Sequence, residues 1–198
     1  MNRLSELNIS NKNLVVRVDM NVPIKDGTVV DNTKIIACMP TIKFALKNNA
    51  KVLLITHLGR PTEGSFEEQF SLKPLVKEIS RILECKVDLV DSLDSTEIFN
   101  CSSNVQILEN IRFFAGEKTN SNELGQALSS LGDIYVFDAF GTSHREHSST
   151  HSAIIHSNLA CAGILLEKEI EALTKALNES KNPYTAIIGG SKVSTKLE

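Results

Sequence analysis

Arginines follow three predicted strands of this chain at the point where each strand ends. Arg60, Arg112 and Arg145 are three of only six arginines, against fifteen lysines, and each comes after a short apolar run. The guanidinium group is a planar fork that binds carboxylate or phosphate oxygens through two parallel hydrogen bonds, which an ammonium group cannot copy. Three such forks in equivalent positions predict a shared anion site, although a single arginine there would more often form a weak surface ion pair.

Other polar residues occupy the same kind of position. His57 and Gly59 end the run that starts at Val52, and Asp19 and Asn21 end the run that starts at Leu14. We expect them to join the arginines around a small ligand that carries both phosphate and carboxylate groups.

Asp138 follows a strand in the same way as Asp19. Either carboxylate can accept from a ligand hydroxyl or orient an arginine, or it can cap a nearby helix. The spacing alone leaves both interpretations open.

Three histidines, His144, His147 and His151, invite a metal interpretation. Their spacing aligns only on a continuous helix, which the intervening Ser148–Thr150 make doubtful, and no cysteine or carboxylate motif supports zinc. We therefore predict no metal site and interpret the histidines as loop and cap residues, with His144 lending charge to the crevice.

A second anion-binding candidate is Gly189-Gly-Ser-Lys192, which follows a predicted strand and precedes a helical pattern. Glycines let the backbone approach a ligand, and a helix amino terminus presents oriented N–H groups. Lys192 and Lys196 are four residues apart and would share one helix face. Neither GxxxxGK[ST] nor GxGxxG is present, so this is not a P-loop, and a dinucleotide site is not favoured.

The elements that must position these residues alternate between strands and helices. Short β-branched runs predict strands at 14–19, 52–57, 86–90, 105–108, 134–137 and 184–188. Amphipathic patterns predict helices at 33–49, 71–83, 124–131 and 162–178, with Pro40 causing a kink or two short helices. This alternation is typical of a doubly wound parallel sheet in a Rossmann-like three-layer α/β/α domain. Because all strands of such a sheet point the same way, the arginines would meet at its carboxyl edge.

The chain is long enough for one domain and the start of another. We expect an α/β domain over 1–160, an interdomain helix over 161–182, and the truncated start of a second, similar domain over 183–198.

Composition narrows the possible partners. The net charge of −3 and the pI near 6.0 argue against binding to nucleic acid or to a membrane surface. Four scattered cysteines without a CxxC motif fit reduced thiols, and the polar amino end lacks the apolar core of a signal peptide. We expect a cytoplasmic protein and a monomer.

Five motifs together resemble the phosphoglycerate kinase family. They are RVDMNVP (17–23), THLGRP (56–61), ENIRFFAGE (109–117), DAFGTSHREHSS (138–149) and GGSKVSTKL (189–197), in the family's order and at similar separations. The resemblance spans essentially the whole chain. The family has, in addition, nearly all of a second domain that this chain lacks.

The resemblance implies a reversible phosphoryl transfer of glycolysis, between 1,3-bisphosphoglycerate with ADP and 3-phosphoglycerate with ATP. In the family the first domain binds the glycerate and the second binds most of the Mg-ATP or Mg-ADP substrate, and closure of the two brings the substrates in line. Such transfer needs positioning and charge neutralisation more than covalent work by the protein.

The resemblance also assigns roles to residues. The substrate-binding set it implies is Asp19, Met20, Asn21, Lys34, His57, Leu58, Gly59, Arg60, Arg112 and Arg145. Lys34 and Lys192 would be catalytic, with Lys192 at the transferring phosphoryl group, and Lys196 would contact the nucleotide phosphates.

Two positions depart from the family pattern. Lys34 stands where the family has an arginine thought to stabilise charge during transfer, so the charge is kept and the fork is lost. Thr56 stands where a serine is usual. These departures and the short length leave an alternative, a non-catalytic anion-binding remnant domain that lacks the nucleotide half.

Overall fold

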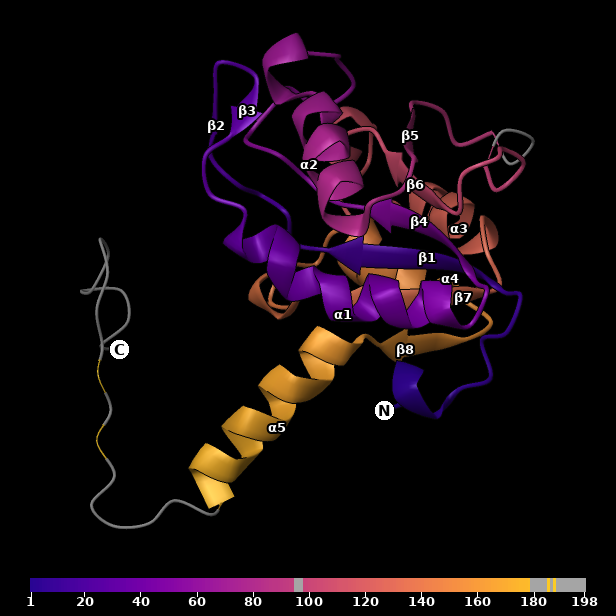
Figure 1. Ribbon diagram of the computed structural model, residues 1–198, viewed down its shortest axis with the longest axis vertical. Coiled ribbons are helices and arrows are strands. Elements are labelled where there is room, and N and C mark those ends of the chain that lie inside the picture. Colours follow the sequence, from indigo (N-terminus) through magenta and orange to yellow (C-terminus); the bar gives the residue numbers. More distant parts are fainter. Residues whose placement is uncertain (95–97, 179–184, 186, 188–198) are drawn as a thin grey trace. The chain divides into compact units, whose positions relative to one another are not determined.

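The computed structural model describes residues 1–94, 98–178, 185 and 187 (Figure 1). The chain divides into two compact units, Met1–Glu167 and Lys168–Glu198. The predicted strand at 184–188 and the Gly189–Lys196 motif lie outside the described residues, apart from positions 185 and 187. Their roles, and the predicted domain boundaries, remain predictions.

A six-stranded parallel sheet organises the first unit. Its strands are β1 (Asn13–Val18), β4 (Lys51–Ile55), β5 (Val87–Val90), β6 (Val105–Leu108), β7 (Ile134–Asp138) and β8 (Ala160–Ala162). They lie in the order β5-β6-β4-β1-β7-β8, and every neighbouring pair is parallel. After β1 the chain builds one half of the sheet, then returns past β1 to build the other half. This confirms the predicted doubly wound sheet and creates a switch point beside β1, where open α/β sheets bind ligands.

Helices cover both faces of the sheet (Figure 1). Helices α1 (Thr33–Lys47) and α2 (Lys73–Leu83) pack on one face, and α3 (Asn122–Ser130) and α4 (Ala153–His156) on the other. The alternation of side chains along β1 shows why two cores form: Leu14 and Val16 contribute to the first, Val15 to the second. Successive strand residues point to opposite faces, so a strand buried on both sides must be apolar throughout.

The helix at 33–49 was predicted to kink or split at Pro40, and the prediction of two short helices is wrong. Helix α1 is continuous from Thr33 to Lys47 with Pro40 inside it. Pro40 is on the exposed side of the helix, so its ring does not disturb the packed face. The helix loses the backbone hydrogen bond that a proline nitrogen cannot donate, while the buried face of Ile35, Met39 and Ile42 holds it to the sheet.

Strand β8 was not predicted, and the expected domain boundary at residue 160 falls at its first residue. Its three residues, Ala-Cys-Ala, are too few and too small to give a strand pattern. They pair with Tyr135–Phe137 of β7. A turn at Asp26-Gly27 joins the antiparallel pair β2 (Ile24–Lys25) and β3 (Thr28–Val29).

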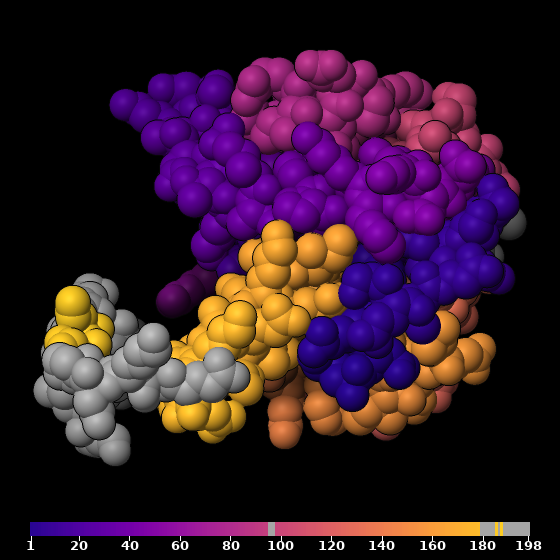
Figure 2. Space-filling model, turned by 60° about the horizontal axis from the view of Figure 1, so that its bottom comes forward, coloured from indigo at the N-terminus to yellow at the C-terminus, as the bar shows by residue number. Residues whose placement is uncertain are grey.

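The amino-terminal residues lie against β8 in the first unit (Figure 2). Asn2 donates to Ala160 O and accepts from Ala162 N, and the following turn η1 (Leu4–Glu6) is tied to the start of helix α5 (Ile164–Asn178) through Ser5 and Glu167. Among the described residues, no helix combines the length and apolar character needed to cross a membrane.

Candidate anion-binding site

The carboxyl ends of β1, β4, β6 and β7 bring the predicted site residues to one edge of the sheet. After β1, Asp19 lies 2.8 Å from the Lys34 ammonium group, which the first turn of α1 supplies. Burial disfavours ionisation of Asp19, but the hydrogen bond and charge of Lys34 outweigh it and hold the pKa of Asp19 below its usual value. Lys34 is half exposed. The pair therefore places one fixed carboxylate and one accessible cation at the switch point.

The loop after β4 carries His57 to Arg60 and is held by two asparagines. Asn110, fully buried, accepts from Leu58 N and donates to Leu58 O and Phe70 O. Asn21 accepts from Gly59 N at 3.0 Å. Gly59 has a φ of +61°, and a Cβ there would lie 2.3 Å from the Phe70 ring, so glycine is required for both conformation and space.

A basic hollow of about 420 Å³ opens beside this loop. It is lined by Arg60, Arg112, Lys118, Arg145 and His147. The Arg112 guanidinium donates to Gly59 O, and Lys118 Nζ lies 3.4 Å from Pro61 O. Among the described residues, no carboxylate forms a salt bridge with Arg60 or Arg145. These guanidinium groups are therefore free to bind an anion.

Mutual repulsion is built into the hollow. Burial and then the charge of Arg145 lower the pKa of Arg112; Glu117 opposes them, and Arg17 and Arg60 act in the lowering direction. Cations held near one another without matching carboxylates gain free energy when an anion enters.

His57 is surrounded by the same charges and responds by staying neutral. Burial, followed by the charges of Arg17 and Arg112, lowers the pKa of His57 to about 3, against the opposing charge of Asp19. Burial and nearby arginines also lower the pKa of His147. The contact of 3.8 Å between His147 Nδ1 and Glu117 Oε1 is therefore not an ion pair between full charges at neutral pH.

A buried polar layer under the hollow was not predicted. Arg17, only 1% exposed, donates through Nε to Ser149 Oγ at 3.0 Å. Glu117 accepts from Ser149 N and Ser149 Oγ, at 2.9 and 2.6 Å. Ser149 belongs to a turn of π-helix, η5 (Ser148–Ser152), a geometry found often at functional sites.

The other predicted residues lie as follows. The side chains of Met20 and Leu58 are buried in the core, so a ligand would reach only their backbone. His144 is exposed and does not line the hollow, whereas His147 does. Lys192 and Lys196 lie outside the described residues.

The open question of Asp138 is resolved in favour of helix capping. Its carboxylate, fully buried, accepts from Thr41 Oγ1 at 2.6 Å and from Leu166 N at 2.8 Å, in the first turn of α5. Burial raises the pKa of Asp138 despite these hydrogen bonds.

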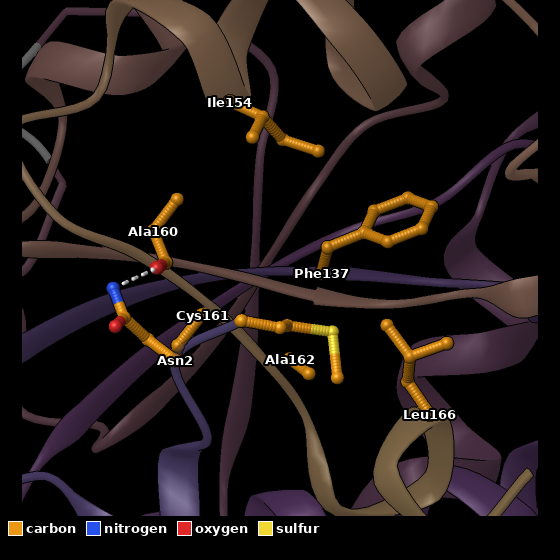
Figure 3. A pocket seen from close by; sticks show the side chains of 8 residues that line it. Asn2, Phe137, Ile154, Ala160, Cys161, Ala162 and Leu166 are labelled. Carbon is orange, nitrogen blue, oxygen red and sulfur yellow. Dashed lines mark hydrogen bonds between the residues drawn. The ribbon is translucent and has the colours of Figure 1, made fainter. Parts of the chain in front are cut away.

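A second hollow of about 450 Å³ has a different character (Figure 3). Phe137, Ile154 and Leu166 point into it, and Asn2 closes one side through its 3.1 Å hydrogen bond to Ala160 O. No charged side chain lines it, so it lacks the guanidinium groups that mark the basic hollow. Within the described part of the chain, no group of histidine, cysteine, aspartate or glutamate side chains could hold a metal ion.

The sheet and the basic hollow together define a class of protein: an α/β domain with a cluster of cationic side chains at the switch point of a parallel sheet. Comparison with known proteins narrows the class to one family. The sequence model of that family, phosphoglycerate kinase, matches residues 4–198. The chain belongs to the phosphoglycerate kinase family.

Relatives are similar along nearly all of the chain. A phosphoglycerate kinase of Vibrio campbellii is 48% identical over 196 residues, and one of Desulfovibrio desulfuricans 46% over 195 residues. Each comparison covers 98% of this chain and 50% of the relative. The chain thus spans about half the length of these curated relatives.

Solved structures agree. The phosphoglycerate kinase of Coxiella burnetii superposes with a TM-score of 0.88 at 42% identity, covering 98% of this chain and 50% of that one. The phosphoglycerate kinase of Pyrococcus horikoshii superposes with a TM-score of 0.86 at 32% identity, covering 100% of this chain and 51% of that one. The three-layer fold is therefore that of this family.

Proposed function

We propose that this chain binds the glycerate substrate of a phosphoglycerate kinase, 3-phosphoglycerate or 1,3-bisphosphoglycerate, for reversible phosphoryl transfer with Mg-ATP or Mg-ADP. The observation that carries the proposal is the basic hollow, in which Arg60 and Arg145 have no carboxylate partner among the described residues. Family membership supplies the identity of the ligand and of the reaction.

In this proposal, different side chains bind different parts of the substrate. The guanidinium groups of Arg60, Arg112 and Arg145 bind the phosphate that is not transferred, because their forks match its oxygens. Asp19 and Asn21 bind the glycerate end, His57 joins the arginines at the phosphate, and Lys34 neutralises charge near the group that is transferred. Lys192 and Lys196 contact the transferring phosphoryl group and the nucleotide.

Calorimetry with 3-phosphoglycerate tests the binding step. Removing one fork, as in Arg60→Ala or Arg145→Ala, is expected to weaken binding at least tenfold, because a charge-assisted hydrogen bond contributes about 1.5–3 kcal/mol. Arg81→Ala is the matched control: Arg81 is exposed on α2 and already paired with Glu78 at 2.7 Å. Absence of binding to the unmodified chain, or equal loss in the control, refutes the proposal.

The transfer step has its own assay. ATP consumption in the presence of 3-phosphoglycerate is measured in an assay coupled to product removal. One sample contains this chain alone. The other also contains, as a separate polypeptide, the half of the V. campbellii relative that this chain does not match. We expect turnover only with the second component, and Arg60→Ala should abolish it. If the chain binds 3-phosphoglycerate but the mixture shows no turnover, the proposed phosphoryl transfer is refuted and the proposed binding of the glycerate substrate still holds.

A further inference from the structure

His57 has a defined orientation because its environment leaves one hydrogen-bonding arrangement. Its ring is 4% exposed, and its Nδ1 lies 3.5 Å from the Arg17 NH2 group. A guanidinium group has only donors, so Nδ1 must accept. A neutral imidazole that accepts at one nitrogen carries its proton on the other, which is Nε2.

Arg17 itself cannot turn away from His57. Its Nε donates to Ser149 Oγ at 3.0 Å, and its NH1 group donates to Val18 O. Ser149 is in turn held by Glu117, and its carbonyl oxygen accepts from Tyr135 at 2.6 Å. The guanidinium group is therefore fixed on two further sides, by Val18 of β1 and by Ser149 of η5, and Tyr135 of β7 holds Ser149 in place.

The Nε2 atom is the free end of this arrangement. Within the described part of the chain, the only hydrogen bond of His57 is the one through Nδ1. The His57 ring therefore has one N–H available to a ligand. The charged groups acting on it are Arg17 on β1, Asp19 after β1, Arg112 in η3 (Ile111–Phe113) and Arg145 before η5, and three of these four oppose protonation.

We propose that Arg17 is a positioning residue that fixes the His57 ring with its proton on Nε2, and that this N–H donates to an oxygen of the bound glycerate substrate. Arg17 then acts through His57 and touches no substrate. The proposal rests on the proposed function for its ligand, but the tautomer is a property of the ligand-free protein.

Side-chain ¹⁵N NMR of the ligand-free chain tests the tautomer. The His57 signals, assigned by their loss in His57→Gln, should show the Nε2–H form throughout pH 5–8. An Nδ1–H form or an imidazolium at pH 7 overturns the proposal, whether or not 3-phosphoglycerate binds.

A double-mutant cycle tests the role of Arg17. The amide of a glutamine donates without needing a tautomer to be set, so 3-phosphoglycerate binding in the His57→Gln background should no longer depend on Arg17. Arg17→Met should weaken binding at least tenfold in the unmodified chain, but less than threefold relative to His57→Gln when the two changes are combined. If Arg17→Met weakens 3-phosphoglycerate binding by the same factor in the unmodified chain and in His57→Gln, Arg17 does not act through His57 and the proposal is overturned.

Folding is monitored by far-UV circular dichroism, since Arg17→Met leaves Glu117 buried without its cation. If that variant does not fold, Ser149→Ala takes its place in the same cycle, because it removes the Nε acceptor and leaves Arg17 in the chain. The result expected for Ser149→Ala, and the result that would overturn the proposal, are those given for Arg17→Met.

Discussion

Replacing Asn110 with alanine should disturb both stability and ligand binding, because one buried amide holds the loop that carries His57 to Arg60. The side chain makes four hydrogen bonds: with Leu58 N at 3.3 Å, Leu58 O at 2.8 Å, Phe70 O at 3.0 Å and Arg112 N at 3.2 Å. Asn110 is fully buried, so water cannot replace all four. The variant leaves polar backbone atoms without partners in the core.

The size of the effect follows from these contacts. Each neutral hydrogen bond contributes about 1 kcal/mol net, and a buried group left without a partner costs about 1–3 kcal/mol. With partial relaxation, Asn110→Ala should lower the free energy of unfolding by about 3–5 kcal/mol. A domain is typically stable by about 5–15 kcal/mol, so the variant should stay folded at 25 °C.

Urea denaturation followed by circular dichroism measures the loss, and calorimetry with 3-phosphoglycerate measures the effect on the site. Affinity should fall about tenfold or more, because Arg112 and the loop lose a common anchor; this corresponds to about 1.4 kcal/mol. Asn32→Ala is the control, since Asn32 makes one partly exposed hydrogen bond, to Glu78 at 2.7 Å. A loss below about 1 kcal/mol with unchanged affinity would refute the reasoning.

Three further outcomes are expected. His57 has a pKa of about 3 when folded and an ordinary value when unfolded, so protons bind the unfolded state preferentially between those values. The free energy of unfolding in urea should therefore fall as pH drops from about 6.5 toward 3, by up to about 1.4 kcal/mol per pH unit. His57→Gln should flatten this slope. A slope that is the same in the variant counts against the lowered pKa of His57. Gly125→Ala should lower the free energy of unfolding by about 1–3 kcal/mol, because the added Cβ would lie 2.2 Å from Ser152 Oγ; an unchanged midpoint in thermal unfolding speaks against the close contact. Lys34→Met should raise the pKa of Asp19, because Lys34 is the main group that offsets the effect of burial on this carboxylate. A ¹³C NMR titration of the Asp19 carboxyl group that gives the same pKa in the variant and in the unmodified chain contradicts this prediction.

The parallel sheet could be predicted from the sequence because its strands are buried on both faces. Runs such as that from Val52 to Ile55 are apolar throughout, which distinguishes them from half-exposed strands. Strand β8 has no such signal, since Ala160–Ala162 becomes a strand only by pairing with β7. Continuity of α1 through Pro40 likewise depends on burial of the opposite helix face, which local propensity does not contain.

The site could be predicted in part for a similar reason. Arg60, Arg112 and Arg145 each follow a strand, and parallel strands bring such positions together. Arg17 gave a weaker signal, a single charge within the apolar run of β1, and its meaning depends on a partner in a distant segment. Lys118 reaches the hollow from a loop whose path has no local pattern.

The hydrogen bond between Arg17 and Ser149 has a consequence for synthesis of the chain, because 132 residues separate the two. At a translation rate of roughly 5–20 residues per second, Arg17 waits roughly 7–26 s before its acceptor has been made. For most of that interval β1, a central strand of the sheet, also lacks its neighbour β7. Nascent chains of this protein therefore pass through a stage with an open strand edge and an unmatched charge, which last until β7 and Ser149 have been made. Folding of the site therefore waits for synthesis as far as Ser149, and it depends on the nascent chain staying free of aggregation until then.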